Sequence, residues 1–379
     1  MLAKDDCWIQ LVQEGKRYVK IIGIVNEGKP KSLRGWVSDL KQLLIKDCGF
    51  GFVWGHAMQV ESNVNYPNNS KIDRRFDHWK TVKIETNDGP LIYKLNRLTK
   101  LWLKMGFCLA PSPETDESPA LARLANDGMA DICKAHPDRF PSFVASLPMN
   151  NPEESVKEID RVIGELDACA VQLFSNVNGE PLDLPKYYPV FERAAQLDVP
   201  IFLHPARGPN FPDYLSEEVS KFDLWWTFGW TYESSVAMAR IVFSGMFDKL
   251  PDIKILTHHL GAMIPYVEGR VGYGQDQMGS RTPGNKLTEF RESLKKRPID
   301  YFKMFYADTA LFGSDAGTEC GLKFFGPDKC LFASDCPFDP EGGPMYIRET
   351  IRVLDKLGIS ESDRKKLYED NTRRLLKLN

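Results

Sequence analysis

The sequence predicts an α/β fold built from repeated strand–helix units. From residue 105 onward, short apolar segments of strand length alternate with longer segments whose apolar residues recur at helical spacing. The short segments are nearly continuous runs of valine, isoleucine, leucine and phenylalanine, which is the pattern of strands covered on both faces of a parallel sheet. Repeated right-handed crossovers of this kind build either an open doubly wound sheet or a closed (β/α)8 barrel.

Seven segments of the chain are expected to form strands. They cover residues 106–110, 143–148, 168–174, 200–204, 253–257, 302–307 and 329–333. No GxGxxG motif follows the first of them, which disfavours a dinucleotide-binding sheet. Seven strands fit a barrel that lacks one strand, or a barrel whose first strand lies in the N-terminal part of the chain.

Besides the segment 261–270 described below, six segments are expected to form helices. They cover residues 118–135, 151–166, 187–197, 233–250, 345–357 and 360–378. The second of them opens with Asn151, Pro152 and two acidic residues, which offers a cap, a proline at the first helical position and negative charge near the helix N-terminus. The first of them is followed by His136 and Pro137, and a proline at this place stops a helix.

Residues 1–104 differ from the rest of the chain. They have mixed charge and no strand–helix alternation, and residues 61–75 have the composition of a polar loop. Residues 48–54 are a candidate strand, although two glycines weaken it. We therefore expect an atypical N-terminal region, 1–104, that contains part of the barrel, and a barrel domain, 105–379.

The composition excludes several classes of protein. The chain of 379 residues carries 49 Lys and Arg against 52 Asp and Glu, a net charge of −3, and so lacks the basic excess that binding to nucleic acid or to a membrane surface requires. No segment approaches the ~18 apolar residues of a membrane span, and the acidic start of the chain does not match a signal peptide. The eight cysteines are scattered without a CxxC pair, so we expect reduced thiols in a cytoplasmic protein.

Three of the predicted strands end in residues that can bind a metal ion or carry a proton. His204 ends the fourth strand, His258 and His259 follow the fifth, and Asp335 follows the seventh. A single histidine at a strand end is more often structural, but in a barrel the carboxyl ends of all strands open on one face, where these side chains would meet. Imidazole and carboxylate groups suit Zn2+, Fe2+ or Mn2+, and such an ion can activate water or polarise a substrate oxygen.

Two arginines and a tryptophan-rich segment lie near these strand ends in the sequence. Arg207 follows His204, and Arg270 ends a segment, 261–270, that is expected to be helical. Either guanidinium can bind a substrate carboxylate through two hydrogen bonds or form a structural ion pair. The segment 224–230 holds three tryptophans, with Trp226 among them, which can wall a substrate site or pack in the core or an interface.

Together these motifs resemble the amidohydrolase superfamily. The sequences FLHP with His204, THHLGAMIPYVEGR with His259 and Arg270, and FASDCPF with Asp335 are similar to the branch that contains aminocarboxymuconate-semialdehyde decarboxylase and γ-resorcylate decarboxylase. The resemblance extends over roughly residues 105–379 in a consistent order. Further supporting segments are 136–149, 171–179, 242–259 and 368–378.

The resemblance implies a (β/α)8 TIM barrel of the metal-dependent hydrolase type. One divalent metal ion is expected at the carboxyl ends of the strands, with zinc as the first choice and manganese as the alternative. The resemblance assigns His204 and Asp335 to the metal, gives His259 and Asp335 catalytic roles in proton transfer, and places Arg270 near the substrate carboxylate. We add Arg207 and Trp226, from their positions in the sequence, as further candidates for substrate binding.

The sequence departs from this family in one respect. The family's first strand carries a His-x-His motif that supplies two metal ligands, and no such motif occurs in this chain. We therefore expect a missing or atypical first strand, a chain that begins after it, and a replaced or inserted stretch at 28–100. His56 and His78 are the histidines outside the barrel pattern of motifs, and neither is expected to bind the metal.

The leading hypothesis is a metal-dependent decarboxylase that acts on an aromatic or dienoic carboxylic acid as a homodimer or homotetramer. A hydrolase of a lactone or an amide is one alternative, because the same metal site serves both reactions. An inactive, metal-deficient member of the family is another, because the His-x-His motif is absent.

Overall fold

A computed structural model describes residues 118–282 and 286–378, together with the backbone of five strands nearer the N-terminus. The chain divides into two compact units, Met1–Met129 and Ala130–Asn379. Among the described helices, none combines the length and the apolar character needed to cross a lipid bilayer.

The strands of the first unit are antiparallel. They are β1 (Leu2–Lys4), β2 (Cys7–Glu14) and β3 (Tyr18–Asn26), which form one sheet, and β4 (Lys80–Thr86) and β5 (Gly89–Leu95), which form a second pair. The candidate strand at 48–54 and the first predicted barrel strand, 106–110, lie outside the described residues.

The second unit is built around a six-stranded parallel sheet. Its strands are β6 (Val144–Ser146), β7 (Ala170–Phe174), β10 (Ile201–His204), β11 (Ile255–Thr257), β12 (Tyr306–Asp308) and β13 (Cys330–Leu331). The strands neighbour one another in sequence order, and each pairing is parallel. A doubly wound sheet reverses its strand order partway, whereas a barrel does not, so this order favours the barrel. Six of the seven predicted strands are therefore confirmed.

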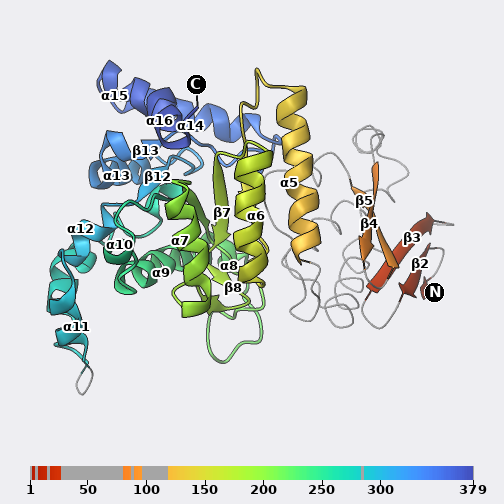
Figure 1. Cartoon of the computed structure of the whole chain (residues 1–379), viewed down its shortest axis with the longest axis horizontal. Helices are drawn as coiled ribbons and strands as arrows, with labels where there is room; N and C mark the ends of the chain where they lie inside the picture. Colours follow the sequence, from red (N-terminus) through yellow and green to blue (C-terminus); the bar gives the residue numbers. More distant parts are fainter. Residues whose placement is uncertain are drawn as a thin grey trace. The chain divides into compact units, whose positions relative to one another are not determined.

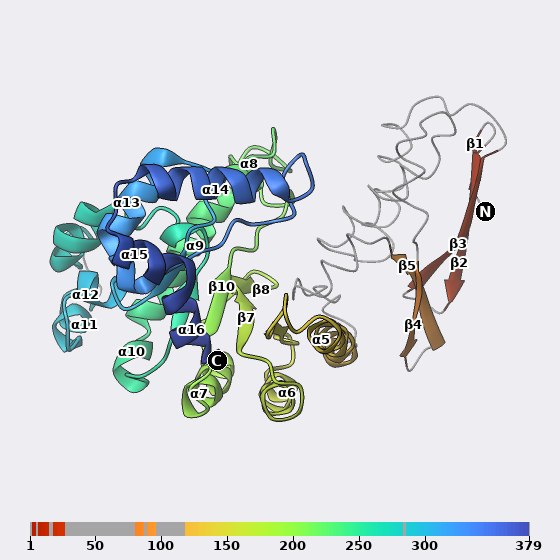
Figure 2. The same cartoon turned by 90° about the horizontal axis from the view of Figure 1, so that it is seen from above.

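The described helices lie before, between and after these strands along the chain. They are α5 (Ser118–Ala135), α6 (Pro152–Glu165), α7 (Tyr188–Gln196), α8 (Leu224–Thr227), α9 (Gly229–Phe243), α10 (Met246–Lys249), α11 (Leu287–Ser293), α12 (Pro298–Phe302), α13 (Asp315–Phe325), α14 (Pro344–Lys356), α15 (Glu361–Lys365) and α16 (Asn371–Leu376). In Figure 1, β7 is seen between α7 and α6, and Figure 2 shows both helices on one side of β7 and β10; the two helices are in contact. A short antiparallel pair, β8 (Asn176–Val177) and β9 (Glu180–Pro181), follows β7.

The core lies between the parallel sheet and its helices. On β7 and β10 the fully buried side chains are Val171, Leu173, Ile201 and Leu203. Ile159 of α6 and Phe191 of α7 are buried to the same extent. Burial of one such side chain stabilises the folded state by roughly 1.5–3 kcal/mol. Strands covered on both faces can bury most of their side chains in this way, which accounts for their nearly continuous apolar sequences.

Several predicted helix ends agree with the structure. The helix predicted at 118–135 has the same bounds as α5. The Asn151 side chain accepts a hydrogen bond from the Glu154 N–H at 3.2 Å and so caps α6, as the Asn-Pro-Glu-Glu sequence predicts. The Ser360 hydroxyl accepts in the same way from the Asp363 N–H at 3.1 Å and caps α15.

Other predicted elements are wrong in their extent. The helix predicted at 233–250 begins earlier, at Gly229, and is broken between α9 and α10 by Gly245, whose φ of 73° favours glycine. The strand predicted at 302–307 begins only at Tyr306, because α12 and a turn precede it.

The helices predicted at 261–270 and 360–378 are also interrupted. The first consists mainly of turns and is followed by a π-helical turn, Arg270–Gly274. The second is divided into α15, a π-helical turn at Lys366–Asp370, and α16. The sequence indicates a helix in both places, but it does not report these local changes of backbone hydrogen bonding.

Asn371 provides a test of how α16 is held to the sheet. Its amide donates hydrogen bonds to the carbonyl oxygens of Pro327 and Cys330, each at 2.6 Å, and the residue is fully buried. We expect Asn371→Ala to lower the free energy of unfolding by about 2–4 kcal/mol, because two carbonyl groups lose their donors. Urea unfolding followed by circular dichroism would measure the change.

The control is Asn210→Ala, which truncates an exposed asparagine and should change the free energy of unfolding by no more than about 0.5 kcal/mol. Equal losses in the two variants would show that the amide of Asn371 does not anchor the C-terminal helix.

Candidate functional site

The structure brings the predicted catalytic and metal-binding residues together. His204 is the last residue of β10, and His258 and His259 follow β11 directly. The ring of His204 lies 5.1 Å from that of His258 and 5.6 Å from that of His259, measured between ring centres. Nε2 of His259 lies 3.8 Å from Oδ2 of Asp335, which is an ion-pair distance, longer than a hydrogen bond.

His204 has the environment of a neutral histidine. Its Nδ1 lies 2.7 Å from the carbonyl oxygen of Pro205. Because a carbonyl group can only accept, this contact favours the proton on Nδ1 and leaves Nε2 as an acceptor. Burial lowers the pKa of His204 well below its usual value, and the neighbouring His258 and His259 lower it further. A neutral imidazole is the form that binds a metal ion.

Aromatic side chains surround the His204 ring. Phe174 at the end of β7 and Trp230 at the start of α9 both meet it edge to face, with ring centres 5.7 and 5.3 Å away. Trp225 and Trp226 pack against Trp230 instead, at 5.7 and 6.4 Å. The tryptophan-rich segment therefore meets the His204 ring through Trp230.

His259 is held in an unusual backbone conformation. Its backbone angle φ is 56°, and those of Leu260 and Ala262 are 50° and 55°, values that residues other than glycine rarely adopt. The His259 N–H donates to Oδ1 of Asp308 at 2.8 Å, which holds this turn. Burial by itself lowers the pKa of His259, but the carboxylates of Asp335 and Asp308 outweigh burial and raise it.

Asp308 is a site residue that sequence reasoning missed. It ends β12, is only 2% exposed, and accepts hydrogen bonds from His258 Nδ1 at 2.6 Å and from the N–H groups of His259 and Ala310 at 2.8 and 3.1 Å. Burial alone would raise the pKa of its carboxyl, but the two histidines and these donors lower it. The available signal was an acidic residue directly after a predicted strand; Asp335 likewise follows a predicted strand, with one residue between.

The imidazole and carboxylate groups at the ends of β10, β11 and β12 are of the type that binds a divalent cation. Nδ1 of His258 donates a hydrogen bond to the carboxylate of Asp308, and the buried Nε2 of His258 has no hydrogen-bond partner among the described residues. A ring oriented in this way by a carboxylate is typical of metal ligands. Within residues 118–282 and 286–378, however, no group of three or more His, Cys, Asp or Glu side chains is placed to hold one ion. A cation here would need donors in addition to those of the described residues.

The two candidate arginines have different surroundings. Nη1 of Arg207 lies 3.2 Å from Oε1 of Glu233, so this guanidinium forms an ion pair with α9. Arg270 is exposed at the start of the π-helical turn, and its guanidinium makes no hydrogen bond or ion pair within the described part of the chain. The role of either arginine in substrate binding stays a prediction.

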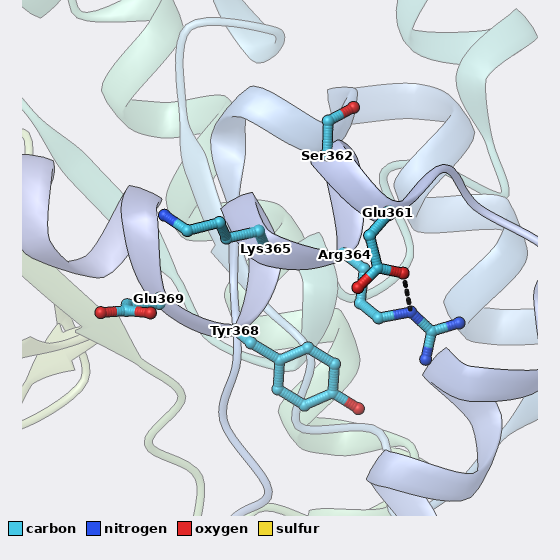
Figure 3. Close-up of a pocket in the computed structure, with 6 residues that line it drawn as sticks. All are labelled: Glu361, Ser362, Arg364, Lys365, Tyr368 and Glu369. Atoms are coloured by element: carbon cyan, nitrogen blue, oxygen red, sulfur yellow. Dashed lines mark ion pairs between the residues drawn. The ribbon is translucent and has the colours of Figure 1, made fainter.

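A surface pocket of about 360 Å³ lies elsewhere, on the C-terminal helices. Figure 3 shows its lining, in which Glu361 and Arg364 form an ion pair at 4.0 Å. The lining residues are Glu361, Ser362, Arg364, Lys365, Tyr368 and Glu369. None of the candidate site residues is among them, so this pocket is separate from the strand-end site.

Comparison with known proteins agrees with the arrangement of these motifs. Residues 114–378 match the family model described as Amidohydrolase. The γ-resorcylate decarboxylase of Polaromonas sp. is 33% identical over 279 residues, which cover 72% of this chain and 79% of the relative. The 2-amino-3-carboxymuconate-6-semialdehyde decarboxylase of Dictyostelium discoideum is 29% identical over 262 residues, 65% of this chain and 66% of the relative.

A solved structure shows the same fold. The dihydroxybenzoic acid decarboxylase of Polaromonas sp., with bound manganese and the inhibitor 2-nitroresorcinol, is 29% identical and superposes with a TM-score of 0.56 over 70% of this chain and 78% of its own. The fold is therefore a TIM barrel, of which the six parallel strands are the described part.

The raised pKa of His259 can be tested by replacing Asp335. In Asp335→Asn we expect the pKa of His259 to fall, because burial remains while the main raising influence is removed. Protonated His259 stabilises the fold at pH values below its unfolded pKa of ~6.5, and this stabilisation is lost as the pH rises through the higher folded value. The variant should therefore lose stability at mildly acidic pH.

Histidine ring resonances, followed by NMR across pH in the presence of a chelator, would measure the shift. Asp252→Asn, which changes an exposed aspartate, is the matched control and should leave the titration of His259 unaltered. An unchanged titration in Asp335→Asn would contradict the assignment of this pair.

Proposed function

The chain belongs to the amidohydrolase family, which confirms the resemblance of its motifs, and we propose that it is a metal-dependent decarboxylase of an aromatic or dienoic carboxylic acid. The observation that carries the proposal is the meeting of His204, His259 and Asp335 at the carboxyl ends of strands of one parallel sheet. Similarity to decarboxylases of a dihydroxybenzoate and of an aminocarboxymuconate semialdehyde supports the reaction type.

His204 and Asp335 are the residues that would hold one divalent metal ion. We keep zinc as the first choice, while manganese is supported by the related dihydroxybenzoic acid decarboxylase, whose structure contains it. When bound, the ion would supply positive charge that stabilises the carboxylate of the substrate. The buried, neutral ring of His204 suits this role, because its Nδ1 contacts a carbonyl group and its Nε2 is left as the donor atom for the ion.

His259 is proposed to deliver the proton. In a decarboxylation the bond between the carboxylate and its neighbouring carbon breaks, the electron pair stays on that carbon, and a proton takes the place of the departing CO2. A protonated imidazole can supply this proton, most efficiently when its pKa lies near the working pH. The carboxylate of Asp335, 3.8 Å away, stabilises the protonated ring and so raises the pKa of His259. The ring therefore stays protonated to a higher pH.

Substrate binding is proposed for Arg270, Arg207 and Trp226. The exposed guanidinium of Arg270 can bind a carboxylate without first breaking an ion pair, whereas Arg207 would have to leave Glu233. Trp226 would act through Trp230, which separates it from His204. The homo-oligomeric state, the cytoplasmic location and the division of the chain after residue 104 stay predictions.

A metal-dependent hydrolase of a lactone or an amide is the alternative function. Asp335 would then take a proton from water, and its partly exposed carboxylate beside His259 also suits that step. A metal-deficient, inactive protein is the remaining alternative.

We expect the purified protein, supplied with Mn2+ or Zn2+, to release CO2 from 2,6-dihydroxybenzoate, from another hydroxybenzoate or from 2-amino-3-carboxymuconate 6-semialdehyde. A chelator should abolish the release, and added Mn2+ or Zn2+ should restore it. Detection of CO2 together with metal analysis of the protein separates the alternatives. Cleavage of lactones without CO2 release would favour the hydrolase, and failure to bind either metal would favour the inactive protein.

The proton-transfer role of His259 predicts that His259→Ala lowers kcat by about 10²–10⁴-fold while the protein stays folded. His136→Ala is the matched control, because this histidine is exposed and lies outside the site. Steady-state CO2 release and circular dichroism would measure both variants. Full activity in His259→Ala would remove its catalytic assignment.

A further inference from the structure

The loop that follows β10 is fixed by two other elements of the barrel. Ser175, directly after β7, donates its N–H to the carbonyl oxygen of His204 and accepts the Ala206 N–H on its hydroxyl, both at 2.8 Å. The Asn176 amide donates to the Ala206 carbonyl oxygen at 2.6 Å. The indole N–H of Trp230 donates to the Arg207 carbonyl oxygen at 3.0 Å, so α9 holds the far end of the loop.

One carboxylate connects these contacts. Oε1 of Glu233, on α9, lies 3.2 Å from Arg207 Nη1, and its Oε2 lies 3.5 Å from the Ser175 hydroxyl and 3.4 Å from the Asn176 amide nitrogen. The side chains of Arg207 and Glu233 are each 19% exposed. An ion pair at this depth is screened less by solvent than one on the surface.

The Glu233 carboxylate also orients the Ser175 hydroxyl and the Asn176 amide. Because a carboxylate can only accept, the Ser175 hydroxyl directs its proton to Glu233 and keeps its lone pairs for the Ala206 N–H. In the same way, the Asn176 amide turns its nitrogen towards Glu233 and Ala206, and its oxygen accepts the N–H of Gly179 at 2.9 Å. The charge of Glu233 therefore favours the observed orientation of the Ser175 hydroxyl and of the Asn176 amide.

We propose that Glu233 is a positioning residue for His204. It acts through Ser175, Asn176 and Arg207 on the backbone of the loop, and through that backbone on the direction of the His204 ring. Trp230, one turn earlier on the same helix, packs against that ring at 5.3 Å and shares the task. The proposal rests on the proposed function in so far as His204 binds a divalent ion. It gives Arg207 a role in holding the loop, which substrate binding would disturb.

The test uses Glu233→Gln, which preserves size and removes the charge. The amide must present its NH2 group either to Arg207 or to Ser175 and Asn176, so a donor faces a donor on one side. We expect the folded variant to bind Mn2+ about 10–100-fold more weakly than the unaltered protein, as found when a residue that orients a metal ligand is changed. Electron paramagnetic resonance of free Mn2+ in a titration would measure the affinity.

A second measurement needs no metal. In the unaltered protein, NMR cross-peaks between the imidazole protons of His204 and the indole protons of Trp230 are expected from the 5.3 Å ring separation. They should weaken or disappear in Glu233→Gln, and Mn2+ affinity and cross-peaks should both be unchanged in the control Glu289→Gln, which alters an exposed glutamate of α11. If Glu233→Gln does not fold, Ser175→Ala, which removes the hydroxyl between Glu233 and Ala206, should show the same two effects.

The outcomes separate the two proposals. Unchanged Mn2+ affinity and unchanged cross-peaks in the folded variant would overturn the positioning role of Glu233. If the unaltered protein binds no Mn2+ or Zn2+, the proposed function fails, and the cross-peaks alone decide whether Glu233 positions the ring. A variant with reduced stability but native affinity and native cross-peaks would make Glu233 a structural residue only and would also overturn the proposal.

Discussion

The buried carboxylate of Asp308 accepts hydrogen bonds from two consecutive residues at the end of the neighbouring strand. Its Oδ2 meets the His258 ring and its Oδ1 meets the His259 N–H. A buried charge is costly unless donors surround it, and here the donors are the groups that must be oriented. The left-handed turn from His259 to Ala262 has backbone angles that cost free energy, and the contact with Asp308 holds that turn in place. The position of the His259 ring opposite Asp335 depends on this contact.

The two central histidines differ in their electrostatic surroundings although their rings are 5.6 Å apart. His204 faces a carbonyl oxygen and two other histidines, so its pKa is low and its neutral form is favoured. His259 faces two carboxylates, so its pKa is raised in spite of burial. Neighbouring groups whose pKa values are shifted in opposite directions can be in different protonation states at the same pH and so take different roles. One histidine is suited to binding a cation, and the other to carrying a proton.

Much of this arrangement could be predicted from the sequence, because a polar residue at the end of an apolar strand is a local signal. His204, His259 and Asp335 were identified in this way, and the parallel order of the strands brings them together. Asp308 has the same signal, but it lies one residue beyond the predicted end of its strand at 307 and is the last residue of β12 in the structure. The partner of Arg207 could not be predicted, because Glu233 is 26 residues away and meets it only through the packing of α9. Trp226 lies in the short helix α8 and Trp230 in α9, and it is Trp230 that packs against His204. The composition of the segment does not reveal where one helix ends and the next begins.

We propose that His204 and Asp335 hold a divalent ion beside His259, the proposed proton donor. Anomalous X-ray scattering from crystals of the protein grown with Mn2+ would locate such an ion. We expect one strong anomalous peak in contact with the imidazole of His204 and the carboxylate of Asp335, on the side of the barrel where the strands end. Well-diffracting crystals with no peak there, or with a peak held by other residues, would show that these two residues do not form the metal site.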